Sequence, residues 1–217
     1  MKLKLIVIAV LTLSILSCNK KDNFNYPAGT VGISRITYYP ILTLIGSNPI
    51  VIAKGSAFTD PGVNAASGST VLTYTTAGTV NNNVPGVYTL TYTAFNSDGF
   101  SASTKRTVIV YSTDATAAAN DLSGKYARTS NGQIATWTKL APGVYQIDNP
   151  GGAVGVNLQV YAFNPTGFSV TIPSQISSDG NTSSSSNFTY VNGNPASYSL
   201  VFLNPGYGTS TRTFIKQ

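Results

Sequence analysis

The sequence predicts an all-β protein in which a β-sandwich is followed by a small antiparallel meander barrel. Three observations support this prediction. Apolar and polar residues alternate with a period of two along many short runs. Turn-forming pairs such as Pro85-Gly86 and Asp98-Gly99 separate those runs. Helical periodicity is almost absent from residue 33 onward.

The first 17 residues have the layout of a secretory signal. Lys2 and Lys4 precede an apolar run over residues 5–16. This run is shorter than the about 20 residues that a transmembrane helix needs. Cys18 follows, and it is the only cysteine in the chain of 217 residues.

The segment Leu16-Ser17-Cys18 resembles the bacterial lipobox, an aliphatic residue and small residues before an obligatory cysteine. The resemblance implies that the signal is cut before Cys18, that its sulfur takes a diacylglycerol and that the new amino terminus is acylated. Because two or more acyl chains anchor a protein stably, we expect a lipid-anchored protein. The alternative is an ordinary signal followed by a chance buried thiol.

The composition disfavours catalysis. The chain has no histidine and its seven acidic residues are all Asp, which removes His-dependent triads and His-rich zinc sites. Most of the Asp residues stand in turn contexts such as Asp60-Pro61-Gly62 and Asp179-Gly180, where Asp commonly bonds its own backbone. No Asp-x-Asp-x-Asp-Gly calcium loop occurs. We therefore expect no enzyme activity, no cofactor and no metal. The scattered basic residues favour no nucleic acid partner.

An enzyme that uses Asp side chains alone is a weaker hypothesis, and Asp121 and Asp148 would be its test positions.

The expected organisation is a signal peptide at 1–17, a flexible lipid-anchored tether at 18–32, a β-sandwich at 33–112, a linker at 113–120 and a barrel-like domain at 121–217. Residues 115–119 of the linker are expected to form one helical turn.

The first domain is expected to have strands at 39–45, 50–53, 71–75, 86–95 and 100–111. The strand at 86–95 is the clearest, because Tyr88, Leu90, Tyr92 and Ala94 alternate with more polar residues. The strand that follows it completes a hairpin.

Residues 40–111 resemble bacterial immunoglobulin-like surface domains of the HYR-related or DUF5011 type. The resemblance is carried by IVIAKGSAFTDPGVNA, by NNNVPGVYTLTYTAFNSDGF and by Arg106, which leads the final RTVIVY. It implies an immunoglobulin-like β-sandwich. The chain departs from the family pattern at 65–68, where AASG replaces an acidic stretch, and this further weakens any metal-binding inference.

The second domain is expected to have strands at 125–130, 133–140, 144–148, 156–163, 168–172, 188–191, 198–203 and 211–216, with a low-complexity loop at 177–187. Eight consecutive strands joined by short turns favour an antiparallel meander, closed or nearly closed into a barrel. A second sandwich is the alternative.

The stretches LSGKYART, PGVYQIDNPGG and RTFIKQ resemble the carboxy-terminal half of Bacteroidetes lipoproteins with DUF5012 or similar lipocalin-like modules. Such proteins commonly accompany glycan-uptake loci of the SusC/SusD kind. The resemblance implies an outer-membrane lipoprotein, on the cell-surface or periplasmic face, that assists glycan binding or uptake. Its expected partners are the membrane, through the N-terminal lipid, and a polysaccharide or an outer-membrane transporter complex. The alternative is an adhesion or envelope-scaffolding protein that binds another protein.

Aromatic side chains are the candidate ligand contacts, because a flat ring can stack on the apolar face of a sugar. The candidates are Trp137, Tyr145 and Tyr207. Trp137 is the only tryptophan and shares a face with Lys139 in strict alternation, whereas Tyr207 lies in a predicted loop. A place in the core is the competing interpretation for each ring.

Overall fold

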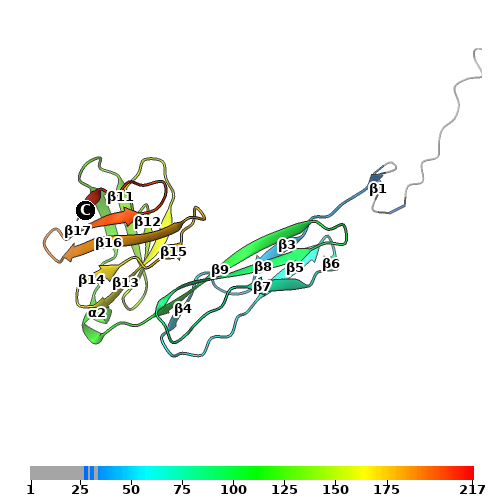
Figure 1. Ribbon diagram of the computed structural model, residues 1–217, viewed down its shortest axis with the longest axis horizontal. Helices are drawn as coiled ribbons and strands as arrows, with labels where there is room; N and C mark the ends of the chain where they lie inside the picture. Colours follow the sequence, from blue (N-terminus) through cyan, green and yellow to red (C-terminus); the bar gives the residue numbers. More distant parts are fainter. Residues whose placement is uncertain (1–26, 29, 32–33) are drawn as a thin grey trace, which may run out of the picture. The chain divides into compact units, whose positions relative to one another are not determined.

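The computed structural model describes residues 27–28, 30–31 and 34–217 (Figure 1). The chain divides into two compact units, Met1–Tyr38 and Tyr39–Gln217. In the first unit, β1 (Thr30–Val31) pairs antiparallel with β2 (Ser34–Arg35). The signal peptide, Cys18 and most of the expected tether lie outside the described residues. Within the described part, no helix is long and apolar enough to cross a membrane.

The second unit begins with the predicted β-sandwich. One sheet has the order β3 (Ile41–Leu44), β5 (Val63–Ser67) and β6 (Thr70–Val71), and the other has the order β4 (Ile50–Ala53), β9 (Ser101–Tyr111), β8 (Gly86–Phe95) and β7 (Tyr74–Ala77). The β8–β9 hairpin pairs from Phe95–Ser101 to Gly86–Val110, as predicted. Strand β5 was not predicted, because VNAAS lacks the apolar alternation that marks the hairpin.

The alternation in β8 sends Leu90, Tyr92 and Ala94 into the sandwich, where all three are buried. Leu90 and Tyr92 pack with Val63 of the facing sheet and with Val108 of the neighbouring strand β9. The residues that alternate with these along β8 and β9 point away from the sandwich core, so the hairpin has a second, more polar face.

The C-terminal part is a single sheet of nine strands, which we call the curled sheet. Its order is β14 (Ser169–Thr171), β13 (Gln159–Thr166), β12 (Val144–Asp148), β11 (Ile134–Ala141), β10 (Gly124–Arg128), β18 (Thr211–Lys216), β17 (Ser197–Leu203), β16 (Thr182–Val191) and β15 (Gln175–Ile176). A helical turn, α2 (Ala115–Ala119), precedes it, and the carboxylate of Asp114 caps this turn by accepting from the Ala117 N–H at 2.7 Å.

The nine strands form an antiparallel meander in which the first strand, β10, lies beside the last, β18. The sheet curls until Ile172, just after β14, meets Ser185 of β16. The Ser185 N–H donates to the Ile172 carbonyl at 3.0 Å, and the Ile172 N–H donates to Ser185 Oγ at 2.9 Å. This arrangement favours the barrel-like interpretation over a second sandwich, and Figure 1 shows the curl.

The predicted loop at 177–187 is wrong from residue 182 onward, because the serine-rich stretch there is the start of β16. Ser184, Ser185 and Ser186 pair with Leu203, Phe202 and Val201 of β17. Serine has little intrinsic strand preference, so neighbouring strands rather than local sequence decide the conformation of this stretch.

The sandwich and the curled sheet belong to the same compact unit. Buried Ile109 of β9 packs against Val144 of β12 and Phe163 of β13. Partly buried side chains surround these three: Val51, Val87, Tyr111, Leu140, Ala141 and Tyr161. We call this set the junction cluster, and it holds the two folded parts together beside the candidate site.

Candidate functional site

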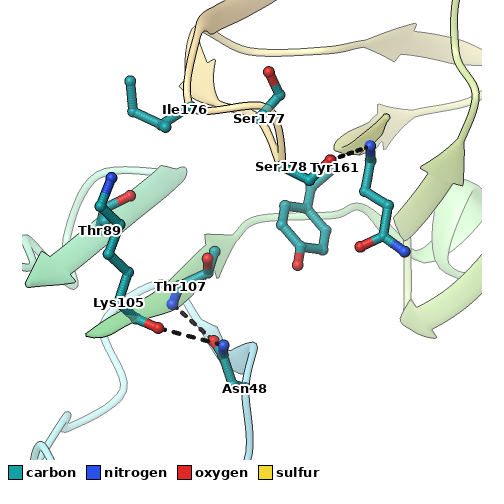
Figure 2. Close-up of a pocket in the computed structure, with 10 residues that line it drawn as sticks. Asn48, Thr89, Lys105, Thr107, Tyr161, Ile176, Ser177 and Ser178 are labelled. Carbon is teal, nitrogen blue, oxygen red and sulfur yellow. Dashed lines mark hydrogen bonds between the residues drawn. The ribbon is translucent and has the colours of Figure 1, made fainter. Parts of the chain in front are cut away.

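A cavity of about 270 Å³ opens beside the junction cluster, and we call it the junction pocket. Figure 2 shows side chains from the sandwich facing side chains from the curled sheet across it. The pocket is lined by Asn48, Thr89, Lys105, Thr107, Gln159, Tyr161, Ile176, Ser177, Ser178 and Gly180.

The sandwich wall consists of outward-facing residues of the β8–β9 hairpin. Because Arg106 and Val108 of β9 point into the sandwich core, Lys105 and Thr107 point out toward the pocket. Thr89 of β8 pairs directly with Thr107. The Thr107 N–H donates to Asn48 Oδ1 at 2.8 Å, which fixes the side-chain amide of Asn48 at the pocket edge.

The wall from the curled sheet combines β13 with the loop after β15. Gln159 and Tyr161 occupy the outward phase of β13, since Val160 and Ala162 are buried inside the sheet. The Gln159 N–H donates to Ser178 Oγ at 2.8 Å, and this bond ties the loop to the strand.

The loop at 177–181 is braced by Asp179. Its carboxylate accepts from Ser177 Oγ at 2.6 Å, from the Asn181 N–H at 3.0 Å and from Asn204 Nδ2 at 3.0 Å. Partial burial raises the pKa of Asp179, but these hydrogen bonds outweigh it and hold the pKa below its usual value. The carboxylate therefore stays ionised at neutral pH, and its hydrogen bonds hold the loop in this conformation.

Tyr161 belongs to both the junction cluster and the pocket lining. Its backbone is clamped by the buried Gln175 side chain, which accepts from the Tyr161 N–H at 2.8 Å and donates to its carbonyl at 2.7 Å. Burial, with the nearby Asp148 carboxylate, raises the pKa of the Tyr161 hydroxyl, and an interaction with Thr107 only partly offsets this rise. The phenol therefore remains a hydrogen-bond donor at neutral pH.

The lining groups can bind a polyhydroxylated ligand. They comprise hydroxyls, side-chain amides, one aromatic ring and one ammonium group. Among the lining residues there is no carboxylate, thiol or imidazole with which to build an acid–base pair. Within the described residues, no group of three or more His, Cys, Asp or Glu side chains could hold a metal ion.

The predicted aromatic candidates lie elsewhere. Trp137 is 2% exposed and Tyr145 is fully buried, and both rings belong to the interior of the curled sheet. The Tyr145 hydroxyl donates to the Asn120 carbonyl at 2.9 Å. Tyr207 packs edge-on against Phe202 with ring centroids 5.0 Å apart, and its hydroxyl is buried. None of these three rings lines the junction pocket, and their contacts are those of core residues.

The two Asp residues proposed as test positions for catalysis make local contacts. Asp121 accepts from the Ser123 N–H at 3.0 Å, and contacts with Ser123 lower its pKa. Asp148 accepts from Gln146 Nε2 at 3.1 Å. Such contacts fit the turn and strand roles that the sequence predicts for these carboxylates.

Sequence reasoning missed the residues of the junction pocket. They come from separate segments of the sandwich and the curled sheet, and each is an ordinary polar residue on the outer face of a strand or loop. The outward phase of β9 was readable from alternation, but no sequence signal indicated that β13 and the 177–181 loop face it.

Comparisons with known proteins agree with the sandwich and add a bacterial context. A family model described as "Bacterial surface protein, Ig-like domain" matches residues 42–110. Among solved structures, the chain is similar to the lipoprotein BT2262 from Bacteroides thetaiotaomicron, with 23% identity, a TM-score of 0.43 and coverage of 82% of this chain and 100% of that chain. No match was found among curated proteins. The bacterial surface match suggests a cell-envelope protein.

Proposed function

We propose that the chain is a non-catalytic cell-envelope lipoprotein that binds a saccharide in the junction pocket, as an accessory in glycan binding or uptake. The lining of that pocket is the observation that carries the proposal. It offers the hydroxyl, amide and aromatic groups that recognise sugars, on walls that are already braced.

The braced walls matter because binding costs less free energy when few groups must be ordered. Asn48 is held by Thr107, and the 177–181 loop is held by Asp179 and by Gln159. A saccharide that enters the pocket would therefore displace water from a preformed surface.

The membrane part of the proposal rests on the lipobox-like residues that end at Cys18. We propose that acylated Cys18 anchors the chain in the outer membrane. The match of residues 42–110 to a bacterial surface domain supports a location in the envelope. Impermeant labelling of intact cells, compared with lysed cells, would distinguish the surface from the periplasmic face.

Affinity electrophoresis and glycan arrays with residues 19–217 test saccharide binding. The matched variants are Tyr161→Phe, which removes a pocket hydroxyl, and Tyr111→Phe, which removes a hydroxyl from the same junction cluster outside the pocket lining. A lost hydrogen bond is worth about 0.5–1.5 kcal/mol, so Tyr161→Phe is expected to weaken binding about two- to tenfold. Tyr111→Phe is expected to leave it unchanged. Absence of binding to every glycan would refute the proposal.

Protein binding is a second candidate function, and an open sheet edge favours it. All four residues of β7 are exposed, and within the described chain β7 pairs with β8 alone. Such an edge can accept a strand from another protein. Pull-down of a transporter or surface protein that is lost on Thr76→Pro, with the fold intact, would support this function. Retention by that variant would oppose it.

A further inference from the structure

We infer that the saccharide bound in the junction pocket is acidic, with a carboxylate or another anionic group, and that Lys105 recognises this charge. The inference rests on the proposed function and names its ligand class. Lys105 is the only charged residue that lines the pocket. In Figure 2 its side chain is drawn on the sandwich wall, across from Ser177, Ser178 and Tyr161.

The ammonium group of Lys105 is available to a ligand. Lys105 is exposed on β9, and the ion pair found among the described residues joins Arg106 to Asp60 rather than Lys105 to a carboxylate. The contact that Lys105 makes with Asn48 uses the backbone carbonyl of Lys105 and leaves its side chain uninvolved. A charged ligand group could therefore approach without breaking an existing ion pair.

The carboxylates closest to the pocket are engaged elsewhere. Asp179 accepts with its two oxygens from Ser177 and Asn181 of its own loop and from Asn204, which follows β17. Asp148 lies near enough to raise the pKa of Tyr161, but it does not line the pocket and it accepts from Gln146 Nε2. Neither carboxylate contributes an oxygen to the lining.

Two other lining side chains, Asn48 and Tyr161, can donate to a ligand. Asn48 Oδ1 already accepts from the Thr107 N–H, and the Asn48 NH₂ group donates to the Lys105 carbonyl at 3.5 Å, which leaves one of its two hydrogens for a ligand. The Tyr161 hydroxyl is protonated at neutral pH, and burial raises its pKa further, so it can donate to a ligand. Carboxylate-lined pockets suit neutral sugars, whose adjacent hydroxyls need acceptors, whereas a cation with neighbouring donors and no carboxylate suits a sugar that carries an anionic acceptor.

The volume fits one sugar residue. At about 30 Å³ for each water molecule, 270 Å³ corresponds to about nine waters, which is enough for a pyranose ring with its substituent. Ligand pockets usually range from about 300 to 1,000 Å³, so this pocket of about 270 Å³ lies just below that range. It would hold one residue of a chain rather than a long segment.

The test is calorimetric titration of residues 19–217 with matched oligosaccharide pairs. The pairs are oligogalacturonate and oligoglucuronate with their methyl esters, and a sulfated galactose oligomer with its desulfated form. Wild type is expected to bind at least one acid about fivefold more tightly than its neutral counterpart. This preference should shrink when the salt concentration rises from about 50 to about 300 mM.

Variants of Lys105 test whether this side chain causes the preference for the acidic member of each pair. Lys105→Met is expected to abolish the preference for the acidic member, and Lys105→Arg is expected to retain it. Lys54→Met removes an exposed lysine outside the pocket lining and should behave as wild type.

The outcomes separate the two proposals. Equal binding of acidic and neutral members, or a preference that survives Lys105→Met, overturns the acidic-ligand inference and leaves saccharide binding intact. Absence of binding to every member overturns the proposed function itself. A preference confined to the carboxylate pairs or to the sulfated pair supports the inference and identifies the anionic group.

Discussion

Replacement of Arg106 by Met is expected to destabilise the sandwich severely. Arg106 is fully buried on β9. Its guanidinium donates to the carbonyls of Ile45, Ser47 and Gly62, and Nε donates to the Tyr92 hydroxyl at 3.1 Å. One side chain thus ties the turn that follows β3 to the turn before β5 and to β8.

The carboxylate of Asp60 completes this arrangement. Its Oδ1 accepts from the Tyr92 hydroxyl at 2.6 Å and from the Gly62 N–H at 3.1 Å, and it lies 3.4 Å from Arg106 Nε. Methionine would fill much of the volume but would leave the three carbonyls without this donor and the carboxylate without its ion-pair partner. An unsatisfied buried carbonyl costs about 1–3 kcal/mol, and the lost ion pair is partly buried because the Asp60 side chain is 26% exposed. We therefore expect a total loss of about 3–5 kcal/mol, a large part of the about 5–15 kcal/mol that stabilises a typical domain.

Urea unfolding followed by far-UV circular dichroism measures this cost. With a slope of about 2 kcal/mol per molar urea, the midpoint for the sandwich is expected to fall by about 1.5–2.5 M. Trp137 fluorescence reports the curled sheet separately, because Trp137 is the only tryptophan. Lys105→Met, on the outward phase of the same strand, should change the free energy of unfolding by less than about 0.5 kcal/mol.

Arg106→Lys distinguishes charge from geometry. Lysine keeps the positive charge but lacks the planar fork of donors that reaches several carbonyls at once, so we expect it to lose most of the same stability. A Met variant with a midpoint within about 0.3 M of wild type, or a Lys variant indistinguishable from wild type, would show that the hydrogen-bond network contributes little.

Four further predictions concern other parts of the chain. Asp179→Asn should flatten the acid limb of the stability curve: the pKa of Asp179 in the folded state lies below its unfolded value of about 3.9, so its contribution is present above that pH and is lost as the pH falls through the folded value. Urea midpoints measured from about pH 6 to about pH 2 check this, and an unchanged acid limb would contradict it. Gly151→Ala should cost about 1–3 kcal/mol in thermal unfolding, because a Cβ atom would lie 2.1 Å from Tyr207 Cε1. Trp137 emission should be that of a buried indole and should not move on saccharide binding, since the ring is 2% exposed and outside the pocket lining; a ligand-induced shift would argue against that placement. Cys18→Ser should abolish acylation and release a folded protein from the membrane, and membrane retention of that variant would refute the lipid anchor.

The predictable parts of the fold are the strands whose own residues show a clear β pattern. The stretches at 86–95, 144–148 and 211–216 coincide with β8, β12 and β18. Each combines apolar alternation with β-branched or aromatic residues, so local sequence and tertiary packing favour the same conformation. In β5 and in the serine-rich half of β16 the local signal is weak, and only the neighbouring strands determine the structure.

The placement of Trp137 shows why the site was harder to predict than the fold. Alternation correctly groups Ala135, Trp137 and Lys139 on one face of β11, and Lys139 suggested that this face is exposed. The face instead points inward, with Ala135 and Trp137 buried. Lys139 lies near the end of the strand, where its ammonium donates to the Asn120 carbonyl at 2.6 Å and to the Ala118 carbonyl at 3.3 Å.

A lysine can share an inward face with a tryptophan when its long stem reaches carbonyls at the end of the sheet. Those carbonyls belong to the segment around α2, so the partner of Lys139 depends on a chain connection that periodicity in β11 does not encode. The same limit applies to the junction pocket. Alternation predicts which residues of β9 point outward. That these residues face β13 follows from the packing of Ile109 on Val144 and Phe163. Because that packing joins positions far apart in the chain, replacement of Ile109, Val144 or Phe163 by alanine should weaken ligand binding without changing any residue that lines the pocket.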